Sequence, residues 1–205
     1  MKKMYVMVLV VAVVMLTASV AMAGIATTKH NLSSNASWSI VGDIAQICVY
    51  CHTPHGGDTT IPLWNRTAGT LAVTPYSSAS MSVPMTSPIS GVSRACFTCH
   101  DGVTSINSLV NYNNGAYTGA NTVVTGFSNL GTDLSNDHPV GVPMTSLTTT
   151  GGYQDPGTTG TTARTFGVNA TVECASCHDV HGAGQPLFLR AANTDSAICL
   201  ACHVK

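Results

Sequence analysis

Charge is scarce in this sequence of 205 residues: Asp, Glu, Lys and Arg together make up 8%, and aromatic residues make up 6%. Beyond Lys2 and Lys3, the only lysines are Lys29 and Lys205. From residue 24 onward, six basic residues stand against nine acidic ones. This composition excludes the basic patch of a nucleic-acid-binding protein. It also lacks the lysine-rich face that steers a soluble carrier to its partner, and weakly charged surfaces favour self-association.

The eight cysteines, by contrast, are all placed in four Cys-x-x-Cys-His segments, at residues 48–52, 96–100, 174–178 and 199–203. Two intervening residues put both thiols on one side of a tight helical turn, where they can reach the two vinyl groups of one porphyrin. The histidine that follows can bind the iron from the same side, which is the attachment signature of haem c. The pattern predicts four covalent haems, attached through Cys48, Cys51, Cys96, Cys99, Cys174, Cys177, Cys199 and Cys202, with His52, His100, His178 and His203 as proximal ligands.

Zinc binding, a disulfide framework and a redox dithiol are the alternative interpretations of these cysteines. Zinc ribbons use Cys-x-x-Cys pairs but need no histidine next in the chain. Disulfides would explain the even cysteine count of an exported protein but not the histidines. Only 8 of the 205 residues are histidine, so chance would not place one after every pair.

Four histidines remain outside the motifs, one for each predicted haem: His30, His55, His138 and His181. Only three methionines follow residue 23, Met81, Met85 and Met144, so histidine is the more economical sixth ligand. Ligation of each iron by two histidines is therefore predicted, with lower reduction potentials than Met/His ligation would give.

His55 and His181 each lie three residues after a proximal histidine. Two histidines this close in sequence cannot easily occupy opposite faces of one haem, so each is expected to bind the iron of a neighbouring haem. His138 has a loop-like setting before Pro139. His30 lies far from any motif.

The N-terminus has the pattern of a secretory signal peptide over residues 1–23. Lys2 and Lys3 precede an apolar run, and Ala21-Met22-Ala23 forms a cleavage site before Gly24. The run is also long enough to serve as an uncleaved membrane anchor. Export agrees with covalent haem attachment, which occurs on the oxidising side of the membrane. No cysteine follows the apolar run to carry a lipid.

About 45 residues per haem remain in the predicted domain, residues 24–205, so the haems must form much of the core. A loop-rich fold with short helices at the motifs and little regular secondary structure is expected. The order of a free histidine, a doubled motif and a single motif occurs twice, which indicates pseudo-modules 24–101 and 102–205. Residues 102–171 carry no motif and are expected to form surface loop or a contact between subunits, with one short strand at 122–125.

The segments around these ligands resemble the doubled-CxxCH multihaem cytochromes, and among them the tetrahaem members that polymerise into extracellular filaments. The resemblance spans nearly the whole chain after residue 23 and includes residues 30–33, 48–55, 62–66, 99–102, 134–139 and 174–182. It implies a homopolymer with a continuous chain of haems, in which a histidine of one subunit binds a haem of the next. His30, on an N-terminal arm, is the candidate for that donor.

The leading hypothesis is an electron conductor, found outside the cell or at its surface, that passes electrons to other redox proteins or extracellular acceptors. A monomeric tetrahaem shuttle of the periplasm is the alternative. An enzyme that converts nitrite or hydroxylamine would need an open iron position, which four available distal histidines argue against. A membrane-anchored quinol oxidase subunit would need the N-terminal segment to stay attached.

Overall fold

The computed structural model describes residues 24–69, 71–85, 89, 91–147, 151–182 and 184–204. Long irregular segments connect short helices and two two-stranded sheets, which confirms the predicted loop-rich fold. The signal peptide predicted over residues 1–23 lies outside the described residues. Within the described ranges, no helix combines the length and the apolar composition needed to cross a membrane.

The helices that carry the motifs are short because their ends are fixed locally. The helix α2 (Ser93–His100) follows Gly91 and is followed by Gly102, whose φ angles of 57° and 77° favour glycine and interrupt the helix. The helix α4 (Cys174–Cys177) begins at a capping box formed by Glu173 and Ser176. The other two motif segments contain the 3-10 helix η3 (Cys48–Tyr50) and the helix α5 (Ala197–Leu200).

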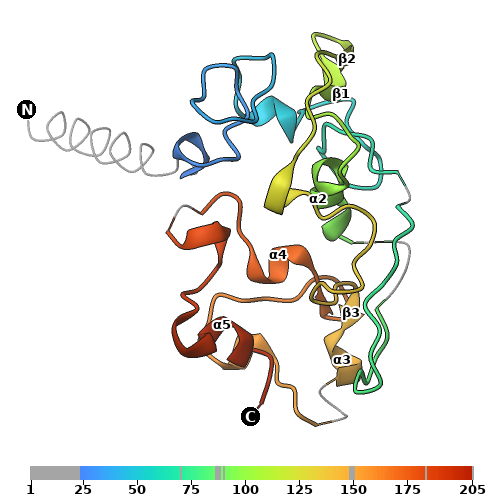
Figure 1. Ribbon diagram of the computed structural model, residues 1–205, viewed down its shortest axis with the longest axis vertical. Helices are drawn as coiled ribbons and strands as arrows, with labels where there is room; N and C mark the ends of the chain where they lie inside the picture. Colours follow the sequence, from blue (N-terminus) through green and yellow to red (C-terminus); the bar gives the residue numbers. More distant parts are fainter. Residues whose placement is uncertain are drawn as a thin grey trace, which may run out of the picture.

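The remaining elements are η2 (Gly24–Thr27), β1 (Ser108–Tyr112), β2 (Gly115–Thr118), η4 (Gly126–Ser128), β3 (Val142–Pro143), α3 (Met144–Leu147), η5 (Pro156–Thr158), β4 (Thr171–Val172), η6 (Pro186–Phe188) and η7 (Thr194–Ser196). The elements are distributed along the long axis of the molecule, with the β1–β2 hairpin at one end, α2 and α4 in the middle, and α3 and α5 toward the other end (Figure 1).

The antiparallel hairpin β1–β2 lies in the segment that was expected to be mainly loop. Its two turn residues, Asn113 and Asn114, have φ angles of 53° and 65°. Asparagine tolerates this left-handed conformation, and a turn with two such residues matches the twist of a hairpin. The Asn-Asn-Gly sequence was therefore the local signal for this element.

The strand predicted at residues 122–125 is wrong. This segment forms no ladder, although the Ile106 amide donates to the Thr122 carbonyl at 2.8 Å. Val124 is buried in the cluster around Tyr50. The β-branched residues there serve packing rather than sheet formation.

Four small hydrophobic clusters replace a single large core. The largest is centred on Tyr50, Ile106 and Leu109, and Cys51 and Cys99 pack against its edge. Each of the other three clusters likewise has at least one motif cysteine beside it. The apolar packing is thus divided among the attachment segments.

Candidate haem sites

Each motif folds into a tight turn that brings the histidine amide back to the first cysteine. The carbonyl of Cys48 accepts from the His52 amide at 2.8 Å, and that of Cys199 accepts from the His203 amide at 2.9 Å. The equivalent bond between the His178 amide and the Cys174 carbonyl is 3.1 Å long. These turns have the local backbone form that haem c attachment requires.

All eight cysteines are free thiols, so the disulfide interpretation does not describe this structure. Burial raises the pKa of Cys51 to about 12 and that of Cys202 to about 11. Burial also raises the pKa values of Cys99 and Cys177. Their surroundings thus disfavour a charged sulfur, which suits the neutral thioether that haem attachment would form.

The four attachment segments follow one another in space in their sequence order. The thiols of Cys51 and Cys99 are close enough for one to raise the pKa of the other. Cys96 and Cys174 share a hydrogen bond, which raises the pKa of Cys96. Cys177 in turn contributes to the raised pKa of Cys202. The fold thus leaves no gap between one attachment segment and the next.

Several histidine rings are oriented by a hydrogen bond from Nδ1 to a backbone carbonyl. His100 donates to Ser128 at 2.6 Å, His178 to Leu187 at 2.8 Å and His138 to Pro139 at 3.0 Å. A histidine that binds metal through Nε2 commonly donates its other N–H in this way. The structure therefore orients proximal and distal candidates alike.

Three proximal histidines each have a distal candidate at one nearly constant separation. The ring centres are 6.2 Å apart for His30 and His100, 6.1 Å for His52 and His181, and 6.2 Å for His138 and His203. An imidazole nitrogen binds a first-row metal at about 2.0–2.1 Å, which puts the centres of two opposite rings roughly 6.2–6.4 Å apart. The three pairs thus have the separation that one shared iron ion requires.

His30 gives an independent test of this fit. Its Nδ1 is buried and has no hydrogen-bond partner, and its ring stacks on Phe188 at 4.6 Å. Burial, with the added effect of His100, His181 and His178, lowers the pKa of His30 to about 4. A buried neutral imidazole among other imidazoles suits an iron ligand, so the residues present fit a haem.

His55 and His178 are left without such a pair. The His55 side chain is exposed, and in the part of the chain that the structure describes no histidine ring lies about 6 Å from either. His181 lies beside His52, and its expected role at the iron of a neighbouring haem stays a prediction. The expected transfer of His30 to another subunit stays a prediction, but within one chain His30 lies beside His100.

The three methionines weighed as sixth ligands pack elsewhere. Met85 and Met144 are 5% and 3% exposed and belong to two hydrophobic clusters, and Met81 packs against both. Across the described ranges, no three side chains of His, Cys, Asp or Glu gather in a group that could hold a metal ion. The chemistry of the site is thus that of paired histidines beside paired thiols.

Sequence reasoning missed a repeated Pro-Leu-aromatic-x-Arg segment after each doubled motif, at residues 62–66 and 186–190. In both copies the leucine has a positive φ, 62° for Leu63 and 55° for Leu187. The backbone of this leucine then forms a hydrogen bond with the proximal histidine. The Leu187 carbonyl accepts from His178, and the backbone of Leu63 bonds to His52. The repeat itself was the available signal, because identical spacing marks an identical structural task.

Four Cys-x-x-Cys-His turns and their histidine pairs define a multihaem c-type cytochrome. Residues 167–205, which include the third and fourth motifs, match the family model described as Doubled CXXCH motif. A comparison with curated proteins gives no match. The match supports a multihaem c-type cytochrome with covalent haem c and a role in electron transfer, and c-type cytochromes are extracytoplasmic.

Proposed function

We propose that the chain conducts electrons through four bis-histidine haems and that copies of it assemble into an extracellular filament. Haem c supplies a one-electron iron couple when it is bound. The observation that carries the proposal is the common ring separation of 6.1–6.2 Å in three histidine pairs. Two histidines of such a pair would both bind the iron of one haem and would leave a substrate no place on it, as an electron carrier requires.

The continuity of the attachment segments supports conduction over the length of the chain. Cys51 approaches Cys99, Cys96 approaches Cys174, and Cys177 approaches Cys202. Each attachment segment therefore lies beside the next. An electron entering at one end therefore has a site to move to at every step.

The unpaired histidines support assembly. His178 lacks a distal partner among the described residues, and His55 is exposed and uncommitted. We propose that His55 of one copy serves His178 of the next, because His30 already has His100 at 6.2 Å. The exposed apolar side chains Phe127 and Val168, at 88% and 99%, and the sparse charge are consistent with contact between copies.

The test compares His55→Ala with His30→Ala in protein that retains four covalent haems. Electron microscopy of secreted protein should show filaments for the natural sequence and for His30→Ala, and discrete particles for His55→Ala. Both variants should gain a high-spin ferric haem in their absorption spectra, at His100 in His30→Ala and at His178 in His55→Ala, so filament formation is what separates them. Filaments lost only in His30→Ala would return the donor role to His30.

Two further outcomes would contradict parts of the proposal. Normal filaments from both variants would exclude a shared ligand between subunits. Discrete particles from the natural sequence would leave the haems intact and favour the monomeric periplasmic shuttle.

A further inference from the structure

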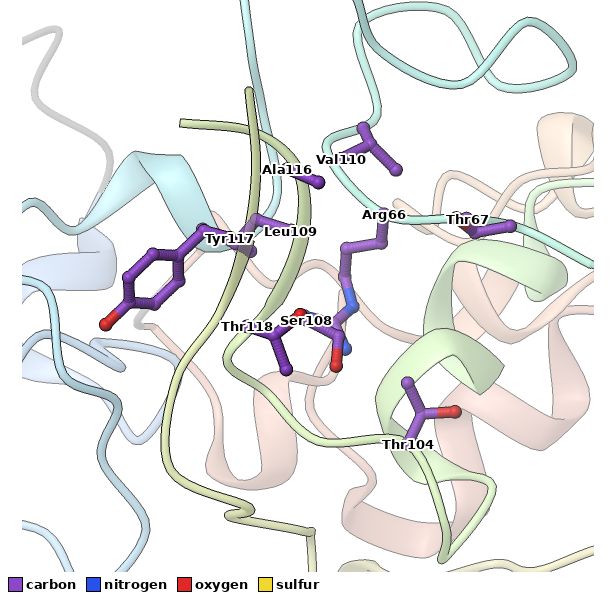
Figure 2. A pocket seen from close by; sticks show the side chains of 9 residues that line it. All are labelled: Arg66, Thr67, Thr104, Ser108, Leu109, Val110, Ala116, Tyr117 and Thr118. Carbon is purple, nitrogen blue, oxygen red and sulfur yellow. The ribbon is translucent and has the colours of Figure 1, made fainter. Parts of the chain in front are cut away.

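Arg66 places a positive charge inside the protein. Its side chain is 1% exposed and lines a cavity of about 260 Å³, where Figure 2 shows it reaching toward Ser108 of β1. Its guanidinium donates to three backbone carbonyls: Thr98 at 3.2 and 2.9 Å, Ile106 at 2.8 Å and Ser105 at 2.5 Å. All these partners are neutral, so the hydrogen bonds satisfy the group without cancelling its charge.

No carboxylate pairs with this charge. Among the described residues, which include all nine acidic side chains, none forms an ion pair with Arg66. Asp101, just beyond His100, is turned to its own loop and accepts from the amides of Val103 at 3.0 Å and Thr104 at 2.8 Å. An unpaired charge at this depth is poorly screened by solvent.

The second Pro-Leu-aromatic-x-Arg segment provides an internal comparison. Arg190 matches Arg66 in the sequence pattern, but its contacts are those of Asn65: its amide donates to Cys177 at 2.8 Å and its side chain to Ala175 at 2.6 Å. Unlike Arg66, it forms an ion pair with Asp179 at 3.0 Å. The two arginines thus differ in place and in electrostatics, and Arg66 is the one that no carboxylate neutralises.

Arg66 lies between the first two attachment segments. Thr98, its double acceptor, is inside the second motif, next to Cys99. The preceding residue, Asn65, binds the first motif, since its amide donates to Cys51 at 2.9 Å and its side chain to Val49 at 2.7 Å. These contacts place the guanidinium of Arg66 between the segment of Cys51 and the segment of Cys99.

We propose that Arg66 is a potential-setting residue, whose buried unpaired charge raises the reduction potentials of the haems attached at Cys48–Cys51 and Cys96–Cys99. Reduction lowers the charge of an iron site by one, so a nearby cation favours the reduced form. Arg190, neutralised by Asp179, has no such effect on the third site. The first two haems therefore have higher potentials than they would have without Arg66. This inference rests on haem attachment at the motifs and not on filament assembly.

The test is a redox titration of soluble four-haem protein, followed by absorption and by electron paramagnetic resonance. Arg66→Met should lower the reduction equilibrium constants of two haems at least tenfold, about 59 mV for a one-electron couple. Arg66→Lys should retain most of the natural potentials because it keeps the charge. Arg164→Met removes the same charge from an exposed position and should leave all four potentials unchanged.

A second pair of variants keeps Arg66 in place in case Arg66→Met fails to assemble. Ser108→Asp adds a carboxylate to the cavity that Arg66 lines and should lower the same two potentials, whereas Ser108→Asn should not. Unchanged potentials in Arg66→Met with four haems, or in Ser108→Asp, would overturn the proposal. Filament formation is scored separately by microscopy, so failure of either proposal is recognised independently.

Discussion

Replacing Glu173 by alanine should loosen the junction between the second and third attachment segments. Glu173 is 3% exposed and its carboxylate accepts both the amide of Ser93, at 3.3 Å, and the Ser93 hydroxyl. That hydroxyl in turn accepts the Cys174 amide at 2.9 Å. The three groups connect the first turn of α2 to the start of α4, 80 residues away in the sequence.

The expected loss follows from counting the groups left without partners. Glu173→Ala removes two hydrogen bonds to a charged acceptor, each worth about 1.5–3 kcal/mol, but it also releases the cost of burying the carboxylate. It further removes the side-chain half of the α4 capping box, worth about 1 kcal/mol. We expect the free energy of unfolding at pH 7 to fall by about 2–4 kcal/mol, measured by guanidinium denaturation. Glu173→Gln keeps an acceptor and should lose less; a loss below about 0.5 kcal/mol in the alanine variant would refute this reasoning.

The pH dependence of the same pair of proteins tests the burial. Burial raises the pKa of Glu173, while the hydrogen bonds from Ser93 oppose the rise. Because the folded chain holds the proton more tightly than the unfolded chain, this residue contributes most stability below the ordinary glutamate pKa of about 4.3. That contribution is lost as the pH rises through the raised pKa, so the natural protein should lose stability relative to Glu173→Gln over that window.

Two further outcomes are expected. The His30/His100 and His138/His203 rings are nearly perpendicular, at 81° and 84°, whereas His52/His181 are at 22°. Parallel ligand planes split the iron π orbitals, whereas perpendicular planes leave them nearly degenerate. Electron paramagnetic resonance spectra of the ferric protein should therefore contain one rhombic and at least two highly anisotropic low-spin signals. A spectrum with rhombic signals only would contradict the geometry. Asp58 accepts the Thr60 hydroxyl and the amides of Ala68, Thr60 and Ile61, and these bonds lower its pKa to about 2. The stability that Asp58 contributes is present above pH 3.8 and is lost as the pH falls toward 2. Asp58→Asn should therefore lower the free energy of unfolding by about 1 kcal/mol at pH 7, measured by denaturant titration, and the two proteins should become equally stable near pH 2. A difference that stays constant with pH would be inconsistent with this assignment.

The attachment segments were predictable because their chemistry is local. Two cysteines and a histidine within five residues fix a turn, whatever the rest of the chain does. The pairing of histidines is not local: His30 meets His100 across 70 residues, and His52 meets His181 across 129. Such pairs depend on the paths of the connecting segments, and those paths have no periodic pattern from which to derive them.

Errors within the connecting segments had a different cause. Residues 122–125 have strand-forming side chains but only an isolated backbone bond, so propensity was overridden by packing of Val124. The hairpin at residues 108–118 and the two Pro-Leu-aromatic-x-Arg segments did have sequence signals. Both depend on residues in the left-handed region, at Asn113, Asn114, Leu63 and Leu187, which hydrophobic periodicity does not detect.

The contacts between the pseudo-modules show why a repeated sequence need not give two separate structures. His181 of the second module lies beside His52 of the first, and Phe188 stacks on His30. Glu173, from the second half of the chain, likewise accepts a hydrogen bond from Ser93 of the first half. Each half therefore supplies side chains that contact or bond the other half. Because the chain has small hydrophobic clusters in place of one core, these contacts between the two halves join it into a single unit.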